Sequence, residues 1–266
     1  MIKESKTIKK ICEIAKCCYD LGWDERNGGN ISLLVSENEV LESLANACSK
    51  GKIETGVDTS SLARKFLLVT GTGKYFRNIP NEPEDALGII RLCDDKTADI
   101  VWGFENGGKP TSELPTHILA HIARLAADDS HSVVIHSHPT NVVAMTFTHP
   151  LDSKSFTLSL WRMITESLVV FPDGVSVLDW MLCGNVEIGK RSAELLNECR
   201  AVIWAHHGIF CTGRDLDETF GLVETIEKSA ELYLKTLGHR ITDGITDDRL
   251  KELATFFGIT PRKGYL

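Results

Sequence analysis

The chain has 266 residues, of which 42% are hydrophobic and 25% charged, and its formal net charge is -8 at pH 7. This composition is that of an ordinary globular protein, and it excludes fibrous, collagen-like and largely disordered chains. A chain of this length can bury a large core without disulfides, and we expect one domain spanning residues 1–266.

The distribution of charged and apolar residues indicates which partners and which cellular location to expect. The longest apolar runs, such as Leu67–Val69, fall far short of the roughly 18 to 20 residues that a membrane helix needs. The acidic balance has no basic tract, so nucleic acid and membrane surfaces are poor partners. Residues 1–5 lack the apolar stretch of a signal peptide, which predicts a cytoplasmic protein. The eight cysteines have no Cys-x-x-Cys spacing and are expected to be free thiols.

The first half of the chain predicts one helix followed by strands. Apolar residues at three-and-four spacing predict a helix from Ile8 to about Leu21, which Gly22 ends. Apolar runs beside glycine-rich turns predict strands at Ile31–Val35 and Phe66–Thr70. Between them, the polar and weakly patterned stretch Ser36–Ser61 is interpreted as a variable excursion on the surface.

The second half alternates helices and strands. Helices are expected at 113–126, 187–199 and 218–237, and strands at 132–135, 168–171 and 202–205. Thr111 or Ser112 would cap the first of these helices, with Pro115 in its first turn. Because strands and helices are interspersed without a linker or a repeat, we expect a single α/β domain in which helices cover a sheet.

Histidines at strand ends are candidate metal ligands. His136 and His138 share one face because strand side chains alternate, although such a pair alone also fits two histidines bonded to backbone. His207, at the end of another apolar strand and before Gly208, strengthens the metal interpretation. Three imidazoles with an open fourth position are typical of catalytic zinc. His206 competes with His207, because adjacent side chains face opposite ways.

Two glycine-rich turns could expose backbone N–H groups to a phosphate. These are Asn27–Asn30 and Thr70–Lys74, and neither matches a P-loop or a dinucleotide-binding fingerprint. Taken alone, each pattern favours a simple turn over a phosphate site. Ser112 lies at a helix start, where it is either an N-cap or part of an anion site. Together the three segments predict a phosphate pocket better than any one of them.

Two carboxylates are candidates for proton transfer. Glu113 opens the helix at 113–126, where it is an ordinary helix-start acid or, if zinc lies nearby, a proton donor and acceptor. Glu166 precedes the predicted strand at 168–171, and from the residues alone it is a solvated charge at a sheet edge.

Taken together, several segments resemble the class II aldolase and adducin-head family, over about residues 8–260. They are Gly-Trp-Asp-Glu-Arg-Asn-Gly-Gly-Asn at 22–30, Val-Thr-Gly-Thr-Gly-Lys at 69–74, Pro-Thr-Ser-Glu-Leu-Pro-Thr-His at 110–117, His-x-His at 136–138, Val-Val-Phe-Pro-Asp-Gly-Val at 169–175, His-Gly at 207–208 and Asp-Glu-Thr-Phe-Gly-Leu at 217–222. Within this family, the segments at 110–117 and 169–175 resemble the branch that cleaves L-rhamnulose 1-phosphate.

The resemblance implies a three-layer αβα sandwich around a central, mostly antiparallel sheet, assembled as a cyclic homotetramer with active sites at subunit boundaries. It implies reversible cleavage to dihydroxyacetone phosphate and L-lactaldehyde, with one zinc ion per subunit. Carried over by position, the zinc ligands are His136, His138 and His207. The phosphate pocket is Asn27, Gly29, Asn30, Thr72, Gly73 and Ser112, and the catalytic residues are Glu113 as acid/base and Glu166 at the aldehyde end.

The chemistry agrees with this assignment. Cleavage of a carbon–carbon bond next to a ketone leaves an enediolate, which zinc stabilises as a Lewis acid, so no Schiff-base lysine is required. Glu113 would return a proton to the dihydroxyacetone phosphate carbon, and Glu166 would accept the proton of the departing aldehyde's hydroxyl. The alternatives are a sibling enzyme (fuculose-1-phosphate aldolase, ribulose-phosphate 4-epimerase or dehydratase) and a non-catalytic scaffold like the adducin head.

Overall fold

One mixed sheet runs along the molecule and carries helices on both faces. The computed structural model describes residues 2–44, 48–239 and 244–266, and within them the sheet has nine strands in the order β2-β5-β4-β3-β1-β6-β9-β8-β7. The strands are β1 (Asn30–Val35), β2 (Gly51–Glu54), β3 (Phe66–Thr70), β4 (Leu87–Leu92), β5 (Thr97–Gly103), β6 (Val133–Ser137), β7 (Ser176–Leu178), β8 (Ala201–Trp204) and β9 (Gly208–Gly213). Every pairing is antiparallel except that of β7 with β8.

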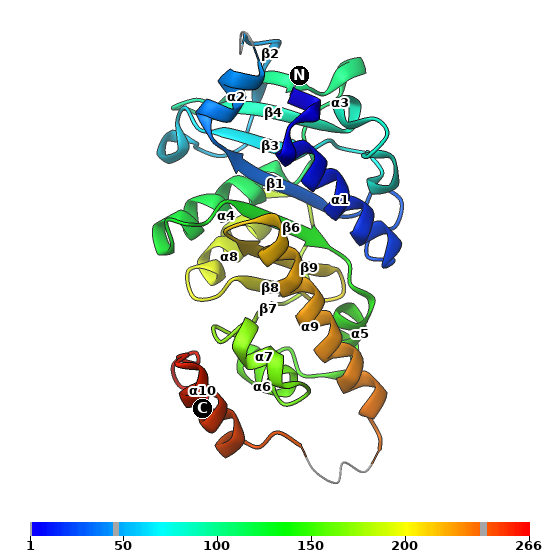
Figure 1. The fold of residues 1–266 in the computed structure, drawn as a ribbon, viewed down its shortest axis with the longest axis vertical. Coiled ribbons are helices and arrows are strands. Elements are labelled where there is room, and N and C mark those ends of the chain that lie inside the picture. The colour runs from blue at the N-terminus through cyan, green and yellow to red at the C-terminus, as the bar shows by residue number, and fades with distance from the viewer. Residues whose placement is uncertain (1, 45–47, 240–243) are drawn as a thin grey trace.

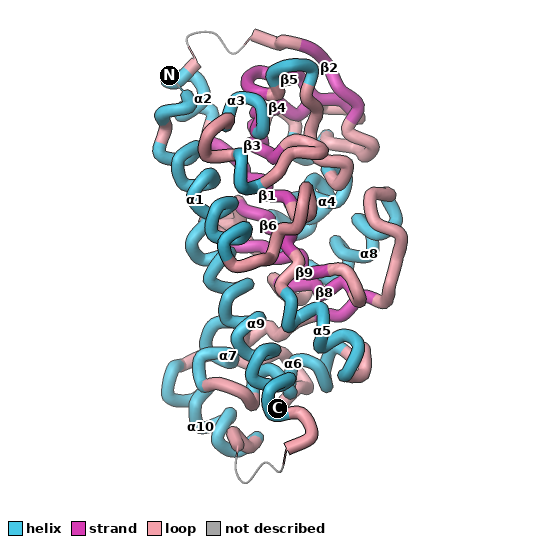
Figure 2. The backbone as a smooth tube through the Cα atoms, turned by 90° about the vertical axis from the view of Figure 1, so that its right-hand side faces the viewer, coloured by secondary structure: helices cyan, strands magenta, loops and turns pink. Residues whose placement is uncertain are grey.

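The helices complete a three-layer αβα arrangement. They are α1 (Lys6–Asp20), α2 (Glu37–Ser43), α3 (Pro83–Ala86), α4 (Leu114–Ala127), α5 (Thr140–Thr148), α6 (Ser153–Trp161), α7 (Thr165–Val170), α8 (Val186–Leu196), α9 (Leu216–Thr236) and α10 (Asp247–Phe257). The paired helices α4 and α8 cover one face of the sheet, and α1 and α9 cover the other (Figure 2). Helices α6, α7 and α10 gather at one end of the molecule beside the lower part of α9 (Figure 1).

Strand β6 shows how the sequence positions the centre of the fold. All its residues are buried because helices cover both sheet faces. Val133 and Ile135 pack into the core cluster on the α1 and α9 side, whereas Val134 packs into the cluster that contains residues of α8. This alternation points His136 to the same face as Val134, and its ring contacts Trp204 and Phe210 of that second cluster.

The structure confirms most of the predicted elements. The helices expected at 8–21, 113–126, 187–199 and 218–237 are α1, α4, α8 and α9, and the strands expected at 31–35, 66–70, 132–135 and 202–205 are β1, β3, β6 and β8. Pro115 lies in the first turn of α4, but the N-cap is Glu113 rather than Thr111 or Ser112. None of the described helices has the length and apolarity needed to cross a membrane, and all eight cysteines are free thiols.

Two predictions were wrong in local detail. Residues 168–171, expected to form a strand, lie mostly in helix α7, and Leu168 is buried in the main core. A short apolar run has no periodicity that separates a buried strand from a buried helical turn. The stretch 36–61 is more than a surface excursion, because it contains α2 and the edge strand β2 and buries Val40 and Val57; its residues 45–47 lie outside the described part of the chain.

Candidate metal centre and active site

The ends of two neighbouring strands bring three histidines together. His136 lies in β6, His138 follows that strand, and His207 lies in the turn between β8 and β9. Their nearest ring nitrogens all lie within 4.8 Å of one another. This cluster is the metal site that the sequence predicts.

Hydrogen bonds on the far side of two rings orient their free nitrogens. The Nδ1 atom of His136 donates to the backbone carbonyl of Ile209 at 3.0 Å, and Nδ1 of His138 donates to the carboxylate of Glu25 at 2.8 Å. With Nδ1 as the donor, each neutral ring presents an unprotonated Nε2, and the two Nε2 atoms lie 3.2 Å apart. Carbonyl and carboxylate partners of this kind orient metal-binding histidines in proteins.

The donor set fits a zinc ion. Two lone pairs that face each other at this distance repel unless a cation lies between them. Zinc–nitrogen distances of about 2.0 to 2.1 Å in a tetrahedron place the ligand atoms about 3.3 Å apart. Burial lowers the pKa of His136 well below its usual value and that of His207 to about 4, which keeps both rings neutral and able to donate to a metal.

Two glycines allow the backbone to close on the imidazoles. A Cβ atom on Gly208 would lie 2.4 Å from the carbonyl oxygen of Ser137 and 2.8 Å from the His138 ring. A Cβ atom on Gly28 would also lie 2.8 Å from the His138 ring. Both positions therefore require glycine for the loops to reach the histidines.

The structure decides between the adjacent histidines 206 and 207. His206 adopts a left-handed backbone conformation with φ of 61°. Its backbone N–H donates to the Thr146 hydroxyl at 3.0 Å, and its ring lies 4.2 Å from that of Phe147, centroid to centroid. His206 is thus held by α5, and His207 alone of the two belongs to the cluster.

Glu113 borders the histidine cluster from the start of α4. Its side chain is buried, and Oε2 accepts a hydrogen bond from Asn30 Nδ2 at 2.9 Å and lies 3.8 Å from Nε2 of His136. Burial raises the pKa of this carboxyl, and the hydrogen bond from Asn30 opposes that shift. A carboxyl whose neutral form is favoured in this way suits exchange of a proton with a substrate.

The three predicted phosphate-binding segments run side by side. The backbone N–H of Thr111 donates to the carbonyl of Thr70, and that of Thr72 donates to the carbonyl of Lys109, both at 2.9 Å. The Thr70 hydroxyl in turn accepts from the backbone N–H of Ile31 at 3.1 Å. These bonds tie the turn after β3 to the segment before α4 and to the start of β1.

The predicted phosphate-binding residues differ in their exposure and in the hydrogen bonds that they already make. Asn27, Thr72, Gly73 and Ser112 are exposed and available to a ligand, and the backbone of Gly29 packs against the carbonyl of His136. Asn30 is buried, and its amide already bonds to Glu113 and to His117. A phosphate contact from the Asn30 side chain would have to use the second Nδ2 hydrogen.

Glu166 lies away from the other predicted residues of the same chain. It is exposed in the first turn of α7, a helix that packs against α6, α9 and α10 at the helical end of the molecule (Figure 1). No described interaction joins it to the histidines or to Glu113 within one chain.

Two residues near the cluster were not predicted. Glu25, which orients His138, lies inside the segment 22–30 and could have been proposed as a metal-site partner from that motif. Cys183 has its sulfur within 4.8 Å of the ligand atoms of Glu113 and His207. It is a single cysteine in a loop, and no local pattern marks it.

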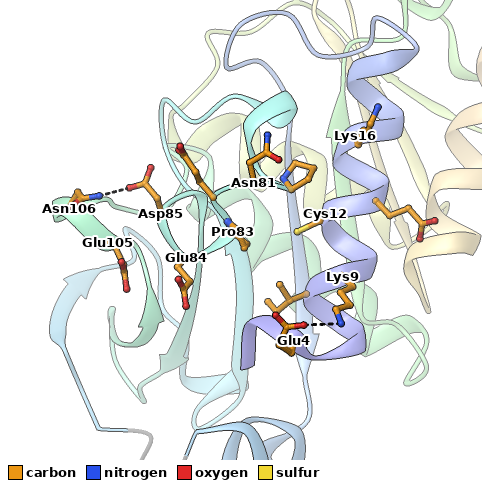
Figure 3. Close-up of a pocket in the computed structure, with 14 residues that line it drawn as sticks. Glu4, Lys9, Cys12, Lys16, Asn81, Pro83, Glu84, Asp85, Glu105 and Asn106 are labelled. Atoms are coloured by element: carbon orange, nitrogen blue, oxygen red, sulfur yellow. Dashed lines mark hydrogen bonds and ion pairs between the residues drawn. The ribbon is translucent and has the colours of Figure 1, made fainter. Parts of the chain in front are cut away.

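One large surface cavity is separate from this site. It has a volume of about 770 Å³ and lies between α1 and the segment around α3, where Cys12, Lys16 and Asp85 contribute to its walls (Figure 3). None of the predicted metal, phosphate or catalytic residues lines it. The candidate site is therefore defined by the chemistry of the histidine cluster and not by this cavity.

Comparison with known proteins identifies the family. The chain belongs to the family described as Class II Aldolase and Adducin N-terminal domain, whose profile matches residues 9–234. Its relatives include proteins named rhamnulose-1-phosphate aldolase from Listeria innocua (46% identical, covering 100% of this chain and 98% of that one) and Enterococcus faecalis (46%, covering 100% and 96%). Another, from Mannheimia succiniciproducens, is 44% identical and covers 94% and 95% of the two chains. The protein is accordingly an aldolase, a lyase that acts on carbon–carbon bonds.

Solved structures confirm the three-layer fold. A sugar-phosphate aldolase from Thermotoga maritima matches with a TM-score of 0.76 and 28% identity, covering 90% of this chain and 98% of that one. An L-fuculose 1-phosphate aldolase matches with a TM-score of 0.64 and 18% identity, covering 96% and 98%. The second likeness concerns the fold alone.

Proposed function

We propose that this protein is a zinc-dependent aldolase that reversibly cleaves L-rhamnulose 1-phosphate to dihydroxyacetone phosphate and L-lactaldehyde, in the cytoplasm, as a step of L-rhamnose breakdown. The observation that carries the proposal is the 46% identity, over the full chain, to relatives named for this substrate. It is supported by the three clustered histidines with Glu113 beside them.

His136, His138 and His207 would hold one zinc ion per subunit. When bound, zinc supplies a Lewis acid that stabilises the negative charge developing on the ketone side of the substrate. Glu25 and the Ile209 carbonyl keep the His138 and His136 rings in the tautomers that leave Nε2 free for the metal. The position of Glu113 beside the cluster leaves it adjacent to any ligand of the metal's open side.

Glu113 would exchange the proton of the dihydroxyacetone phosphate carbon. Its burial favours the protonated form and excludes water, and the Asn30 amide fixes one carboxylate oxygen, which leaves the other to face the substrate. In the direction of synthesis, the same carboxylate would remove that proton and so generate the nucleophilic carbon.

The phosphate would lie against the three tied segments. Asn27, Gly29, Asn30, Thr72, Gly73 and Ser112 are proposed as its pocket, with backbone N–H groups of the two glycine-rich turns and the start of α4 as donors. Fixing the phosphate orients the substrate so that the bond to be broken lies beside Glu113 and the histidines.

Glu166 would complete the site from a neighbouring subunit. We propose a cyclic homotetramer with active sites at subunit boundaries, in which Glu166 accepts the hydroxyl proton at the aldehyde end. The exposure of Glu166 on a distant helix supports this arrangement. So do Trp180 and Leu182, which are 64% and 65% exposed in the loop that carries Cys183 beside the site. A large exposed apolar patch is typical of a contact surface.

The identity of the released products tests the substrate. The purified protein would be incubated separately with L-rhamnulose 1-phosphate and L-fuculose 1-phosphate, and the products identified by NMR. We expect dihydroxyacetone phosphate and L-lactaldehyde from the first compound, at a kcat/KM at least roughly tenfold above that for the second, since one differently placed hydroxyl can give such a ratio. A preference for the second compound, or an epimerised or dehydrated product, would establish the sibling activity instead.

A further inference from the structure

A continuous chain of buried hydrogen bonds leads away from the proposed acid/base. Oδ1 of Asn30 bonds to Nε2 of His117, and Nδ1 of His117 lies 2.7 Å from the Ser32 hydroxyl. The same hydroxyl lies 2.8 Å from Nε2 of His121, whose Nδ1 lies 2.9 Å from Nε2 of His131. The groups come from β1, from α4 and from His131, two residues before β6, and all are buried.

The direction of every hydrogen bond in this chain follows from Glu113. Its carboxylate accepts, so the Asn30 amide must turn Nδ2 toward Glu113 and Oδ1 toward His117. His117 must therefore carry its proton on Nε2 and accept at Nδ1. An amide turned the other way would set Oδ1 against the carboxylate oxygen, which is a repulsive contact.

The rest of the chain admits one arrangement as well. The Ser32 hydroxyl must donate to Nδ1 of His117 and accept from Nε2 of His121. Nδ1 of His121 then accepts from Nε2 of His131. Burial lowers the pKa of His117 to about 3 and that of His131 to about 4, so these rings stay neutral and act as fixed donors rather than proton carriers.

Packing alone does not account for three neutral histidines inside the sheet and helix layers. Buried polar groups add to stability only if all are satisfied, and apolar side chains on this face of α4 would bury the same area without that condition. Here each polar atom from Nε2 of His131 to Oε2 of Glu113 has a partner, and Nδ1 of His131, without a partner among the described residues, lies at the end farthest from Glu113. The chain of hydrogen bonds therefore ends at Glu113, the proposed acid/base.

We propose that His117 is a positioning residue for Glu113: it holds the Asn30 amide in the orientation that donates to Oε2, while Ser32, His121 and His131 fix the tautomer of His117. This inference rests on the proposed function, because it requires Glu113 to be the acid/base. In this arrangement His117, Ser32, His121 and His131 would not touch the substrate.

Two substitutions of His117 separate positioning from packing. In His117→Gln, the terminal amide N–H can reach the place of Nε2 and donate to Asn30. In His117→Asn, the shorter amide reaches only the place of Nδ1, toward Ser32. The readouts are kcat and KM for cleavage, zinc content, and exchange of the hydroxymethyl hydrogen of dihydroxyacetone phosphate with D₂O, followed by NMR without aldehyde.

We expect kcat and the hydrogen-exchange rate of His117→Gln to stay within about threefold of the wild-type values. In His117→Asn both rates should fall at least roughly tenfold, the factor typical of one lost buried hydrogen bond. KM and zinc content should not change. If His117→Asn does not fold, Ser32→Ala offers a second test. It removes the hydroxyl that keeps Nδ1 of His117 an acceptor, so it should also slow hydrogen exchange. The ¹⁵N spectrum of histidine-labelled protein should show His117 protonated on Nε2.

Equal losses in the two His117 variants, wild-type exchange in His117→Asn, or a change confined to KM or zinc content would overturn the positioning role. The Glu113→Ala variant distinguishes this failure from that of the proposed function. If Glu113→Ala loses exchange while His117→Asn keeps it, only the positioning role falls. If Glu113→Ala keeps exchange, the proposed function falls first.

Discussion

Nε2 of His136 and Nε2 of His138 face each other at 3.2 Å, each ring being held from behind by a hydrogen-bond acceptor. This arrangement follows from the alternation of side chains at the end of β6 and from the glycines that let neighbouring loops close on the rings. It is the arrangement that a shared metal ion would require. Glu25 is the partner whose contribution is most easily tested, because its side chain is largely exposed.

Replacing Glu25 should weaken metal binding without removing a ligand. We expect Glu25→Ala to lower zinc affinity by about 10- to 100-fold, the usual effect of losing the partner of a metal-binding histidine. A competition titration with a chromophoric chelator measures this change. Glu252→Ala, at an exposed carboxylate of α10, is the matched control and should bind zinc like wild type. Equal affinities in the two variants would show that Glu25 does not orient His138.

Removal of the Glu113 carboxylate should separate catalysis from metal binding. Glu113→Ala is expected to retain zinc but to lose roughly 10²- to 10⁴-fold in kcat, the range typical of a general acid/base. Glu113→Gln preserves the packing and can still accept from Asn30, so it should lose activity to a similar degree. Steady-state kinetics with metal analysis provides the measurement. Normal turnover in either variant would exclude the acid/base role.

Glu166 provides a test of the subunit boundary. Glu166→Ala should lose cleavage but retain hydrogen exchange into dihydroxyacetone phosphate, since Glu113 alone serves that step. Co-expression of Glu113→Ala with Glu166→Ala chains should restore activity to about one quarter of wild type, because random mixing in a ring gives that share of intact sites. Mixed oligomers that are seen by native mass spectrometry yet stay inactive would contradict a site shared between subunits.

Asp24 gives the fold a predictable dependence on pH. Its carboxyl is only 3% exposed, and burial, with a smaller effect of Glu25, raises its pKa from 3.8 to about 8. The unfolded chain releases this proton at lower pH than the native chain. The contribution of protonated Asp24 to the free energy of unfolding is therefore full below pH 3.8 and is lost as the pH rises toward 8.

The variant Asp24→Asn should therefore gain stability relative to wild type as the pH rises. The difference in unfolding free energy should grow by at most about 1.4 kcal/mol per pH unit between pH 5 and pH 8. Urea denaturation of both proteins across this range measures it, and a constant offset between wild type and variant reflects only the different packing of the amide. A difference that does not change with pH would contradict a raised pKa for Asp24.

The sequence predicts the parts of the site that have a local signal. An apolar run that ends in His-x-His and a second that ends before Gly208 are visible in the chain itself, and they form β6 and β8, which both pair with β9. The choice between His206 and His207 was not available from the residues, because it depends on a left-handed turn and on a contact with Thr146 in α5.

Contacts between distant segments account for what the sequence did not predict. The hydrogen bond from Asn30 to Glu113 joins residues 83 positions apart, and the positioning chain through His117 exists only once β1 and α4 are packed together. Strands β4 and β5 were not predicted, since their pattern is interrupted by glycine and charged residues. The proposed role of Glu166 would depend on assembly beyond one chain, which no local pattern reports.

The central claim is that a metal bound by three histidines makes this chain cleave L-rhamnulose 1-phosphate. Release of dihydroxyacetone phosphate should be followed with a coupled reductase, before metal removal, after removal with a chelator, and after restoration of zinc. The account predicts release that disappears on chelation and returns with zinc. Release that persists in protein shown to be metal-free, or none from the zinc-loaded protein, would contradict it.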